Sequence, residues 1–324
     1  MEGGGGLKLV TFEAEGVERT GILLDDRIVD ANAAYASYLK DEEDEDLAVE
    51  IAGVKVPPDM IRLLSTGRSG RRALENAKIY VEKLLGEDQE DLVSPGGLQV
   101  IYNPGEIRWK APIPRPSKLV ELAFAYKGVA DEFDLKRDSG DVIFMEKALS
   151  AITAHEMPII HPKDSERVIT EIELGIIMGK RAEKVGEEEA LEYVAGYTIV
   201  NDINAIDISL QDSFLMHYKG DSYPTFAPIG PCLVLKDQVP DPNDLDVTIW
   251  INGVVGQSYN TGEALHTVSQ IVSQISGVIP LETGDIISCG AYSGVSACVI
   301  KPKDIIECEI KSIGRLRNHV VAEE

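Results

Sequence analysis

Two glutamates stand one residue apart in a stretch that otherwise has the composition of a buried strand. Residues 170–185 read TEIELGIIMGKRAEKV, in which Glu171 and Glu173 precede an apolar run without helical spacing. In a strand, residues i and i+2 point to the same face, with Cα atoms about 6.5–7 Å apart. The two carboxylates would therefore converge, and one would take up a proton unless a divalent cation lay between them. A solvated strand end is the alternative interpretation.

A third carboxylate is expected to join this pair. Asp202 lies in AGYTIVNDINAID, where an apolar run ends in Asn-Asp, a pattern typical of a strand end. A returning strand, reached through a short helix over 186–194, could place Asp202 beside the two glutamates. Three carboxylates without a neighbouring His or Cys favour a hard cation, Mg²⁺, Mn²⁺ or Ca²⁺. Three protein ligands would leave coordination positions open for water or substrate, as in catalytic sites.

The chain that must position these residues divides into two parts. Residues 7–31 alternate β-rich runs with turn signals at Glu15-Gly16 and Asp25-Asp26, which predicts a small antiparallel meander. Residues 58–86 have helical spacing. The segment 87–118 is rich in Gly, Pro and acidic residues, and its prolines interrupt regular structure. We therefore expect a small N-terminal α+β domain over 1–105 and a second domain over 106–324.

The second part is mostly β. Strands are predicted around 199–200, 229–235, 247–251, 285–290 and 305–314, and Asn252-Gly253 indicates a hairpin with a type I′ turn. Two helices stand out, the acidic 186–194 and the amphipathic 261–276, with Gly277 as C-cap. The lack of regular βαβ alternation excludes a Rossmann or TIM design. We predict a mainly β (α+β) protein built as a mixed β-sandwich or roll.

Composition limits the class of partner. Of 324 residues, 44% are apolar and 27% charged, as in ordinary globular proteins, but the net charge is −24. This charge argues against a nucleic-acid or anionic-membrane partner. The acidic run 41–46 is expected to be a solvated loop or a helix start. No membrane span, signal peptide or CxxC pair is recognisable, so we expect a cytoplasmic protein with four reduced, buried cysteines.

Longer motifs make the chain resemble the fumarylacetoacetate hydrolase family. EIELGIIMGKRAEKV, YVAGYTIVNDINAID and KGDSYPTFAPIGPCLV occur in the family's order, and APIPRPSKL and TGDIISCG fit further segments, so that the resemblance covers about residues 108–315. It implies the family's mixed β fold, commonly a homodimer, with a divalent metal on Glu171, Glu173 and Asp202. It also implies a small 2-oxo acid substrate, whose developing enolate the ion would stabilise.

The resemblance assigns further residues and also shows where the chain departs from the family. Lys219 in YKGDSY matches a lysine near the substrate oxygens, and Lys147 in FMEKALSAI matches a position on the substrate loop. Relatives usually carry NYxxHxxE, whose His and Glu activate a water. Here AYKGVADEF places Val129 at the His and Glu132 at the Glu. Valine cannot move a proton, whereas Glu132 could act as base if a closed lid raised its pKa, or could be a surface acid.

A second departure concerns the turn that follows TGDIIS. Many relatives have Thr-Gly-Thr-Pro there, but this chain has Cys289-Gly290-Ala291-Tyr292, which removes two hydroxyls that could contact the substrate carboxylate.

Three functions follow from these observations. The first is metal-dependent hydrolysis of a C–C bond in an acylpyruvate-type substrate, with altered acid–base machinery. The second is a dehydratase, isomerase or decarboxylase of a 2-oxo acid on the same scaffold, of which dehydration needs no activated water. The third is a non-catalytic protein that retains the metal and the ligand but has lost the base.

Overall fold

The computed structural model describes residues 6–324 except 88, 90, 133–139 and 212–213, and only the backbone of 214–217. The chain divides into two compact units, Met1–Ile113 and Pro114–Glu324. The composition of the sequence predicts the division after residue 105. The first unit reaches further because strand β5 (Arg108–Lys110) pairs with β1 (Lys8–Ala14).

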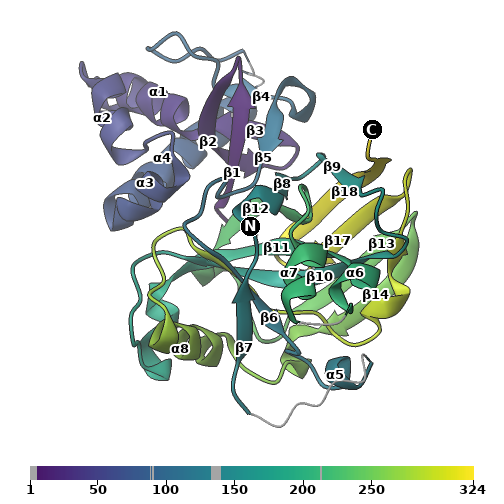
Figure 1. Ribbon diagram of the computed structural model, residues 1–324. Coiled ribbons are helices and arrows are strands. Elements are labelled where there is room, and N and C mark those ends of the chain that lie inside the picture. Colours follow the sequence, from purple (N-terminus) through teal and green to yellow (C-terminus); the bar gives the residue numbers. More distant parts are fainter. Residues whose placement is uncertain (1–5, 88, 90, 133–139, 212–213) are drawn as a thin grey trace. The chain divides into compact units, whose positions relative to one another are not determined.

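The first unit contains the predicted antiparallel meander (Figure 1). Its other strands are β2 (Val17–Leu24), β3 (Arg27–Asp30) and β4 (Ile101–Tyr102), in the order β4-β3-β2-β1. The backbone turns where the sequence predicted, with Glu15, Gly16 and Asp25 at positive φ. The helices are α1 (Ala31–Glu43), α2 (Ala48–Lys55), α3 (Met60–Ser65) and α4 (Gly67–Leu85), with a 3₁₀ turn η1 (Pro104–Glu106).

Helices α1 and α2 were not predicted. Small, buried residues cover most of α1, so no single apolar stripe marks it. The acidic run 41–46 lies at the end of α1, with Asp44 as a left-handed C-cap, and the expected helix start there is wrong.

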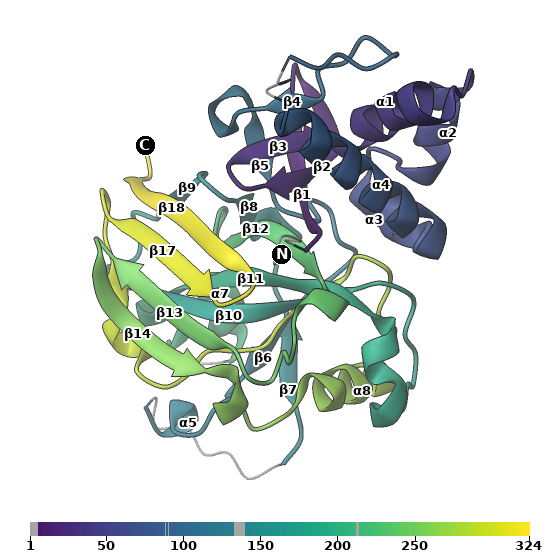
Figure 2. The ribbon, with the colours of Figure 1, turned by 180° about the vertical axis from the view of Figure 1, so that it is seen from behind.

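The second unit is built from two packed β-sheets (Figure 2). One sheet has the order β12-β11-β10-β15-β6-β7, with β16 also on β10 and β8 on β12, and the other has the order β14-β13-β17-β18-β9. The first sheet comprises β6 (Leu119–Ala123), β7 (Ile143–Glu146), β8 (Ile152–Ala154), β10 (Val168–Met178), β11 (Val194–Ala205), β12 (Ala227–Leu235), β15 (Ile286–Ser288) and β16 (Val299–Ile300). The second comprises β9 (Pro158–His161), β13 (Asp246–Ile251), β14 (Val254–Asn260), β17 (Ile305–Ile310) and β18 (Gly314–Ala322).

The short helices of this unit lie around the sheets. They are α5 (Val129–Glu132), α6 (Ile206–Ser209), α7 (Phe214–Asp221) and α8 (Val268–Val278), and the 3₁₀ turns are η2 (Leu149–Ala151), η3 (Glu187–Tyr193), η4 (Lys236–Gln238), η5 (Thr261–Glu263) and η6 (Val295–Ala297). The mainly β, α+β architecture is thus confirmed. Among the described segments, no helix is long and apolar enough to cross a membrane.

Details of the second unit differ from the prediction. The helix expected over 261–276 is split into η5 and α8, because Thr267 caps α8 through Gln270, and α8 ends against Ile279 rather than Gly277. The segment predicted as a helix over 186–194 is the 3₁₀ turn η3. The hairpin at Asn252-Gly253 is confirmed, with both residues at positive φ. All four cysteines are buried and lie outside disulfide bonds, as expected.

Candidate active site

The central antiparallel pair, β10 and β11, brings three carboxylates to one region. Glu171 pairs directly with Asp202 across the two strands, and Glu173 lies two residues further along β10. Side chains of directly opposed residues share a face, as do residues i and i+2, so all three point the same way. Asp202 lies within the twelve-residue strand β11, not at the strand end that the sequence indicated, because the pairing with β10 continues beyond it through Ile203 to Ala205.

A cavity of about 110 Å³ lies over these side chains and is open to solvent. This is well below the roughly 300–1,000 Å³ of pockets for drug-sized ligands, so the site suits a small molecule. The described residues that line it are Glu121, Leu122, Ala123, Phe124, Val129, Met145, Glu171, Glu173, Asp202, Asn204, Ile206, Leu210 and Ala291.

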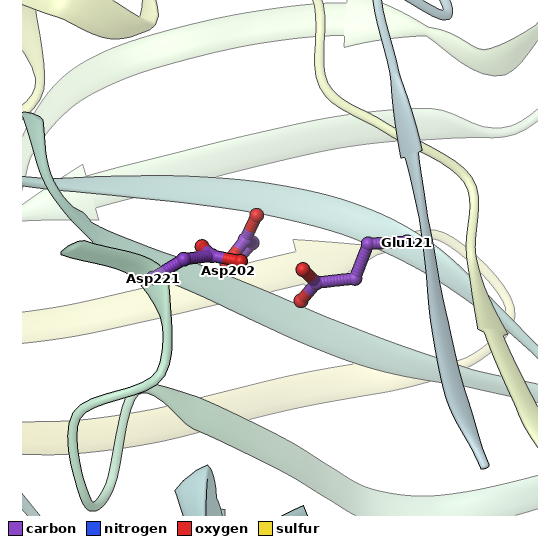
Figure 3. Close-up of side chains that lie close together, drawn as sticks. All are labelled: Glu121, Asp202 and Asp221. Atoms are coloured by element: carbon purple, nitrogen blue, oxygen red, sulfur yellow. The ribbon is translucent and has the colours of Figure 1, made fainter. Parts of the chain in front are cut away.

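A second group of carboxylates shares Asp202. Glu121 of β6, Asp202 of β11 and Asp221 at the end of α7 each offer an oxygen within 4.8 Å of the others (Figure 3). Such a group could hold a metal ion. The fully buried Lys147 ammonium also contacts all three, at 3.2 Å from Glu121 Oε1, at 2.9 Å from Asp221 Oδ1 and directly at Asp202 Oδ1.

Lys147 is therefore an internal counter-ion. Burial alone would lower its pKa, but Asp202, Asp221 and Glu121 together raise the pKa of this ammonium well above its usual value. It also donates to the Ile203 carbonyl oxygen at 3.2 Å, which fixes it against β11. Lys147 thus contacts carboxylates and a backbone carbonyl, and its predicted place beside the substrate stays a prediction.

One ammonium does not neutralise the whole cluster. Burial, and then the charge of Asp202, raises the pKa of Glu173 to about 8. Burial likewise raises the pKa of Asp202 to about 7, although Lys147 opposes this. The pKa values of Glu171 and Glu121 are raised well above the usual range by burial and by neighbouring carboxylates. Without a cation, these carboxyl groups therefore tend to hold protons, and a divalent cation would favour their ionised form.

Glu173 is held in place by the turn that departs from the family pattern. Ser288 Oγ and the Gly290 backbone N–H donate to the same oxygen, Oε2, at 2.6 and 2.7 Å. Gly290 has φ of +77°, and a Cβ there would lie 2.6 Å from the Ala125 Cβ, so only glycine fits this position. Ala291 lines the cavity with a methyl group where a hydroxyl was expected from the resemblance.

Glu132 is not poised as a base in this structure. Burial acts to raise its pKa, but hydrogen bonds from Ser296 and Gly294 outweigh burial and lower the pKa below the usual value. Its two oxygens accept backbone N–H groups of Gly294, at 2.7 Å, and Ser296, at 2.9 Å. The pKa of Glu132 is therefore not raised in this structure, and its role as a base stays a prediction. Val129, one turn earlier on α5, is buried and lines the cavity.

Lys219 is not brought to the carboxylates. Its side chain is 55% exposed, and its ammonium lies 3.7 Å from the similarly exposed Asp164. Two residues later, Asp221 faces Lys147 and accepts from Asn204 Nδ2 at 3.2 Å. The segment that suggested a lysine at the site therefore contributes an aspartate.

Sequence reasoning missed Glu121 and Asp221. Glu121 had a usable signal, because it interrupts the apolar run LVELAFA and a buried acid needs a partner. For Asp221, the sequence contains no signal that distinguishes it from Lys219, because both are charged residues near the end of one short helix.

The donor set fits a hard divalent cation. Every candidate ligand is a carboxylate oxygen, and in the described part of the chain no ion pair joins Glu171 or Glu173 to a basic side chain. Two overlapping groups of carboxylates could hold the ion. The first lies on the strand pair β10–β11 and consists of Glu171, Glu173 and Asp202. The second surrounds Lys147 and consists of Glu121, Asp202 and Asp221.

Comparisons with known proteins agree with this architecture. A family profile described as fumarylacetoacetate (FAA) hydrolase C-terminal matches residues 118–321. The chain is 31% identical to the fumarylacetoacetate hydrolase domain-containing protein 2 homolog of Dictyostelium discoideum, over 97% of both chains. It is 33% identical to the mitochondrial oxaloacetate tautomerase FAHD2A of Bos taurus, over 67% of this chain and 70% of that one. The solved structure of a fumarylacetoacetate hydrolase from Exiguobacterium antarcticum, 25% identical, superposes with a TM-score of 0.71 over 98% of this chain and all of that one.

Proposed function

Because the chain belongs to the fumarylacetoacetate hydrolase family, we propose that it is a divalent-metal-dependent enzyme that interconverts the keto and enol forms of a small 2-oxo acid. The observation that carries the choice of reaction is the absence, in the described part of the site, of a histidine–glutamate pair. Val129 is an apolar wall and Glu132 is tied to the backbone of Gly294 and Ser296. Keto–enol interconversion needs a proton transfer but no activated water.

We place the ion on Glu171, Glu173 and Asp202. The alternative group around Lys147 already receives a positive charge, whereas Glu171 and Glu173 carry raised pKa values without a described basic partner. Mg²⁺ or Mn²⁺ suits this all-oxygen set, and Ca²⁺ is the third candidate. The ion would supply a Lewis acid for the two oxygens of a 2-oxo acid.

The chain's own residues would then bind the substrate and handle its proton. Lys147 fixes Asp202, and Ser288 with Gly290 fixes Glu173, so both carboxylates are oriented before a ligand enters. Leu122 and Val129 would form apolar walls beside the carbon chain of the substrate. Glu121 lines the cavity outside the proposed metal set, and we assign it the transfer of the proton at carbon 3.

Relatives support this reaction class. One of them is named as an oxaloacetate tautomerase, which is a keto–enol isomerase. C–C hydrolysis of an acylpyruvate is the second candidate, because the family's own name and the Exiguobacterium relative are those of a hydrolase.

The test is deuterium exchange at carbon 3 of 2-oxobutyrate in D₂O, followed by proton NMR. Exchange should require Mg²⁺ or Mn²⁺, disappear with EDTA, and fall on the order of 100-fold in Glu171→Gln. Glu187→Gln on the exposed surface of η3 is the matched control and should exchange like the wild type. Glu121→Gln should slow exchange while leaving metal affinity intact.

Two results would argue against the proposal. An exchange rate that changes neither on removal of the metal nor in Glu171→Gln would refute the metal-dependent reaction. Release of pyruvate from acetylpyruvate without carbon-3 exchange of any 2-oxo acid would favour hydrolysis instead.

A further inference from the structure

The cavity has two chemically different halves. One side carries the carboxylates Glu121, Glu171, Glu173 and Asp202, which belong to the proposed function. The other side is formed by the apolar side chains of Leu122, Phe124, Val129, Met145, Ile206 and Leu210. A ligand anchored at the carboxylates through a 2-oxo acid group would therefore direct its remaining carbons against hydrocarbon.

The apolar half is built into the fold. Val129 is 7% exposed and Ile206 5% exposed, and Ile206 packs into a buried cluster with Ile169, Ala291 and Val295. Leu210, by contrast, is 53% exposed and lines the cavity where it opens to solvent.

The backbone conformation of Phe124 is a second observation that supports a functional role for the apolar half. Its φ is +55°, a left-handed conformation that is costly for a bulky side chain and is kept where the surroundings enforce it. The residue lies on the chain directly after β6, the strand that carries Glu121, and lines the same cavity.

Charge opposes a second anionic group on the ligand. Four carboxylates line the cavity, and Asp221 lies behind them against Lys147. A carboxylate at the far end of a substrate would lose its hydration against an apolar wall and would also be repelled by the cluster. An aliphatic end would instead gain from burial, by about fourfold in affinity for each CH₂.

We infer that the enzyme selects 2-oxo monocarboxylic acids with a short branched or unbranched aliphatic tail, and discriminates against 2-oxo dicarboxylic acids such as oxaloacetate. This inference rests on the proposed function for the anchoring of the 2-oxo acid group. The specificity-determining residues are those of the apolar half, in which Leu210 is exposed and Met145 and Phe124 are half-buried.

The experiment uses unreactive amide analogues, so that binding is measured apart from turnover. Oxamate measures the binding of the anchoring group alone. N-isobutyl oxamate and N-oxalylglycine extend it by tails of similar shape. The tail of N-isobutyl oxamate ends in two methyl groups, and that of N-oxalylglycine ends in a carboxylate. Calorimetric titration into the Mg²⁺-loaded protein should show N-isobutyl oxamate binding at least about tenfold more tightly than oxamate. N-oxalylglycine should bind no more tightly than oxamate.

A pair of variants tests the wall directly. Met145→Arg places a cation in the apolar half and should shift the ratio of the two dissociation constants toward N-oxalylglycine by at least about tenfold. Met145→Leu keeps the wall apolar and should preserve the order of the two ligands.

The outcomes separate this inference from the proposed function. If N-oxalylglycine binds the wild type as tightly as N-isobutyl oxamate, the selectivity is wrong while the 2-oxo acid site stands. If none of the three analogues binds, including oxamate, the anchoring site itself is wrong and both proposals fail. A preference for N-isobutyl oxamate that Met145→Arg does not change would overturn the assignment to this wall.

Discussion

Lys147 contacts the carboxylates of Glu121, Asp202 and Asp221 with an ammonium that is fully buried. Lys147→Met would leave these carboxylates without their cation, which typically costs about 3–5 kcal/mol for a buried ion pair. We expect a loss of this size in the free energy of unfolding, measured by urea denaturation. Lys311→Met removes an exposed lysine that lies 3.6 Å from Asp246 and should change stability by less than about 0.5 kcal/mol. Equal effects of the two substitutions would refute the counter-ion role.

The metal-free protein should become less stable as the pH rises. Glu173 and Asp202 have folded-state pKa values of about 8 and about 7, above their ordinary values of 4.5 and 3.8. Between the ordinary and the folded-state pKa, the folded chain holds more protons than the unfolded chain, so the free energy of unfolding falls as pH rises through this window. Urea midpoints in EDTA at pH 5, 6.5 and 8 should decline in that order.

Two comparisons show whether these carboxylates cause the decline. Glu173→Gln cannot ionise at this position and should flatten the profile, and Mg²⁺ should offset the decline because it binds the deprotonated carboxylates. A midpoint that increases from pH 5 to pH 8 in EDTA would contradict the raised pKa values.

For single residues, spacing along the chain predicted part of the site, whereas contacts between distant segments could not be predicted. The period of a strand was enough to predict that Glu171 and Glu173 share a face, and the structure adds Asp202 opposite Glu171. Glu121 joins them only because β6 and β10 both pair with β15, an arrangement that spacing along the chain does not encode. The departure at Val129 was visible in the sequence, but the hydrogen bonds that fix Glu132 to Gly294 and Ser296 were not.

The pairing of strands β10, β11 and β12 positions the carboxylates of the site. Within this pairing, Gly196 of β11 is a position that cannot accept a larger side chain. A Cβ at Gly196 would lie 2.0 Å from the Val234 carbonyl oxygen, a backbone atom that cannot move alone. We expect Gly196→Ala to reduce the free energy of unfolding by about 3 kcal/mol and to lower metal affinity, since β11 carries Asp202.

Gly186→Ala is the matched control for this strand. No heavy atom lies within 4 Å of the added Cβ, and its φ is −68°, so stability should stay within about 0.5 kcal/mol of the wild type. Thermal denaturation and Mn²⁺ titration of both variants provide the measurement. A Gly196→Ala protein with normal stability would show that the β11–β12 pairing is looser than the structure indicates.

Among the elements, turns and strands were easier to predict than helices. The meander and the Asn252-Gly253 hairpin follow from residues that tolerate positive φ. Helix α1 was missed because alanine-rich helices buried on several sides lack the stripe on which periodicity depends. The split of 261–276 depends on one cap, Thr267, whose side chain accepts from the Gln270 backbone N–H and starts α8 inside the apolar spacing.

The net charge of −24 acts over the whole molecule and opposes the approach of anionic substrates. Screening shortens the range of this field from about 30 Å at 0.01 M salt to about 8 Å at 0.15 M. We therefore predict that kcat/KM for 2-oxobutyrate rises severalfold between these ionic strengths in KCl. Choline chloride should give the same rise, because screening depends on ionic strength and not on the identity of the cation. A value that stays constant or falls would show that the local site outweighs the global field.

The central claim is that Glu171, Glu173 and Asp202 together hold the divalent ion. The most direct measurement is anomalous X-ray scattering from crystals grown with Mn²⁺ and oxamate. The account predicts an anomalous peak in direct coordination with oxygens of all three residues, with oxamate completing the shell and Lys147 still against Asp202 and Asp221. A peak enclosed by Glu121, Asp202 and Asp221 with Lys147 displaced, or no peak at either group, would contradict it.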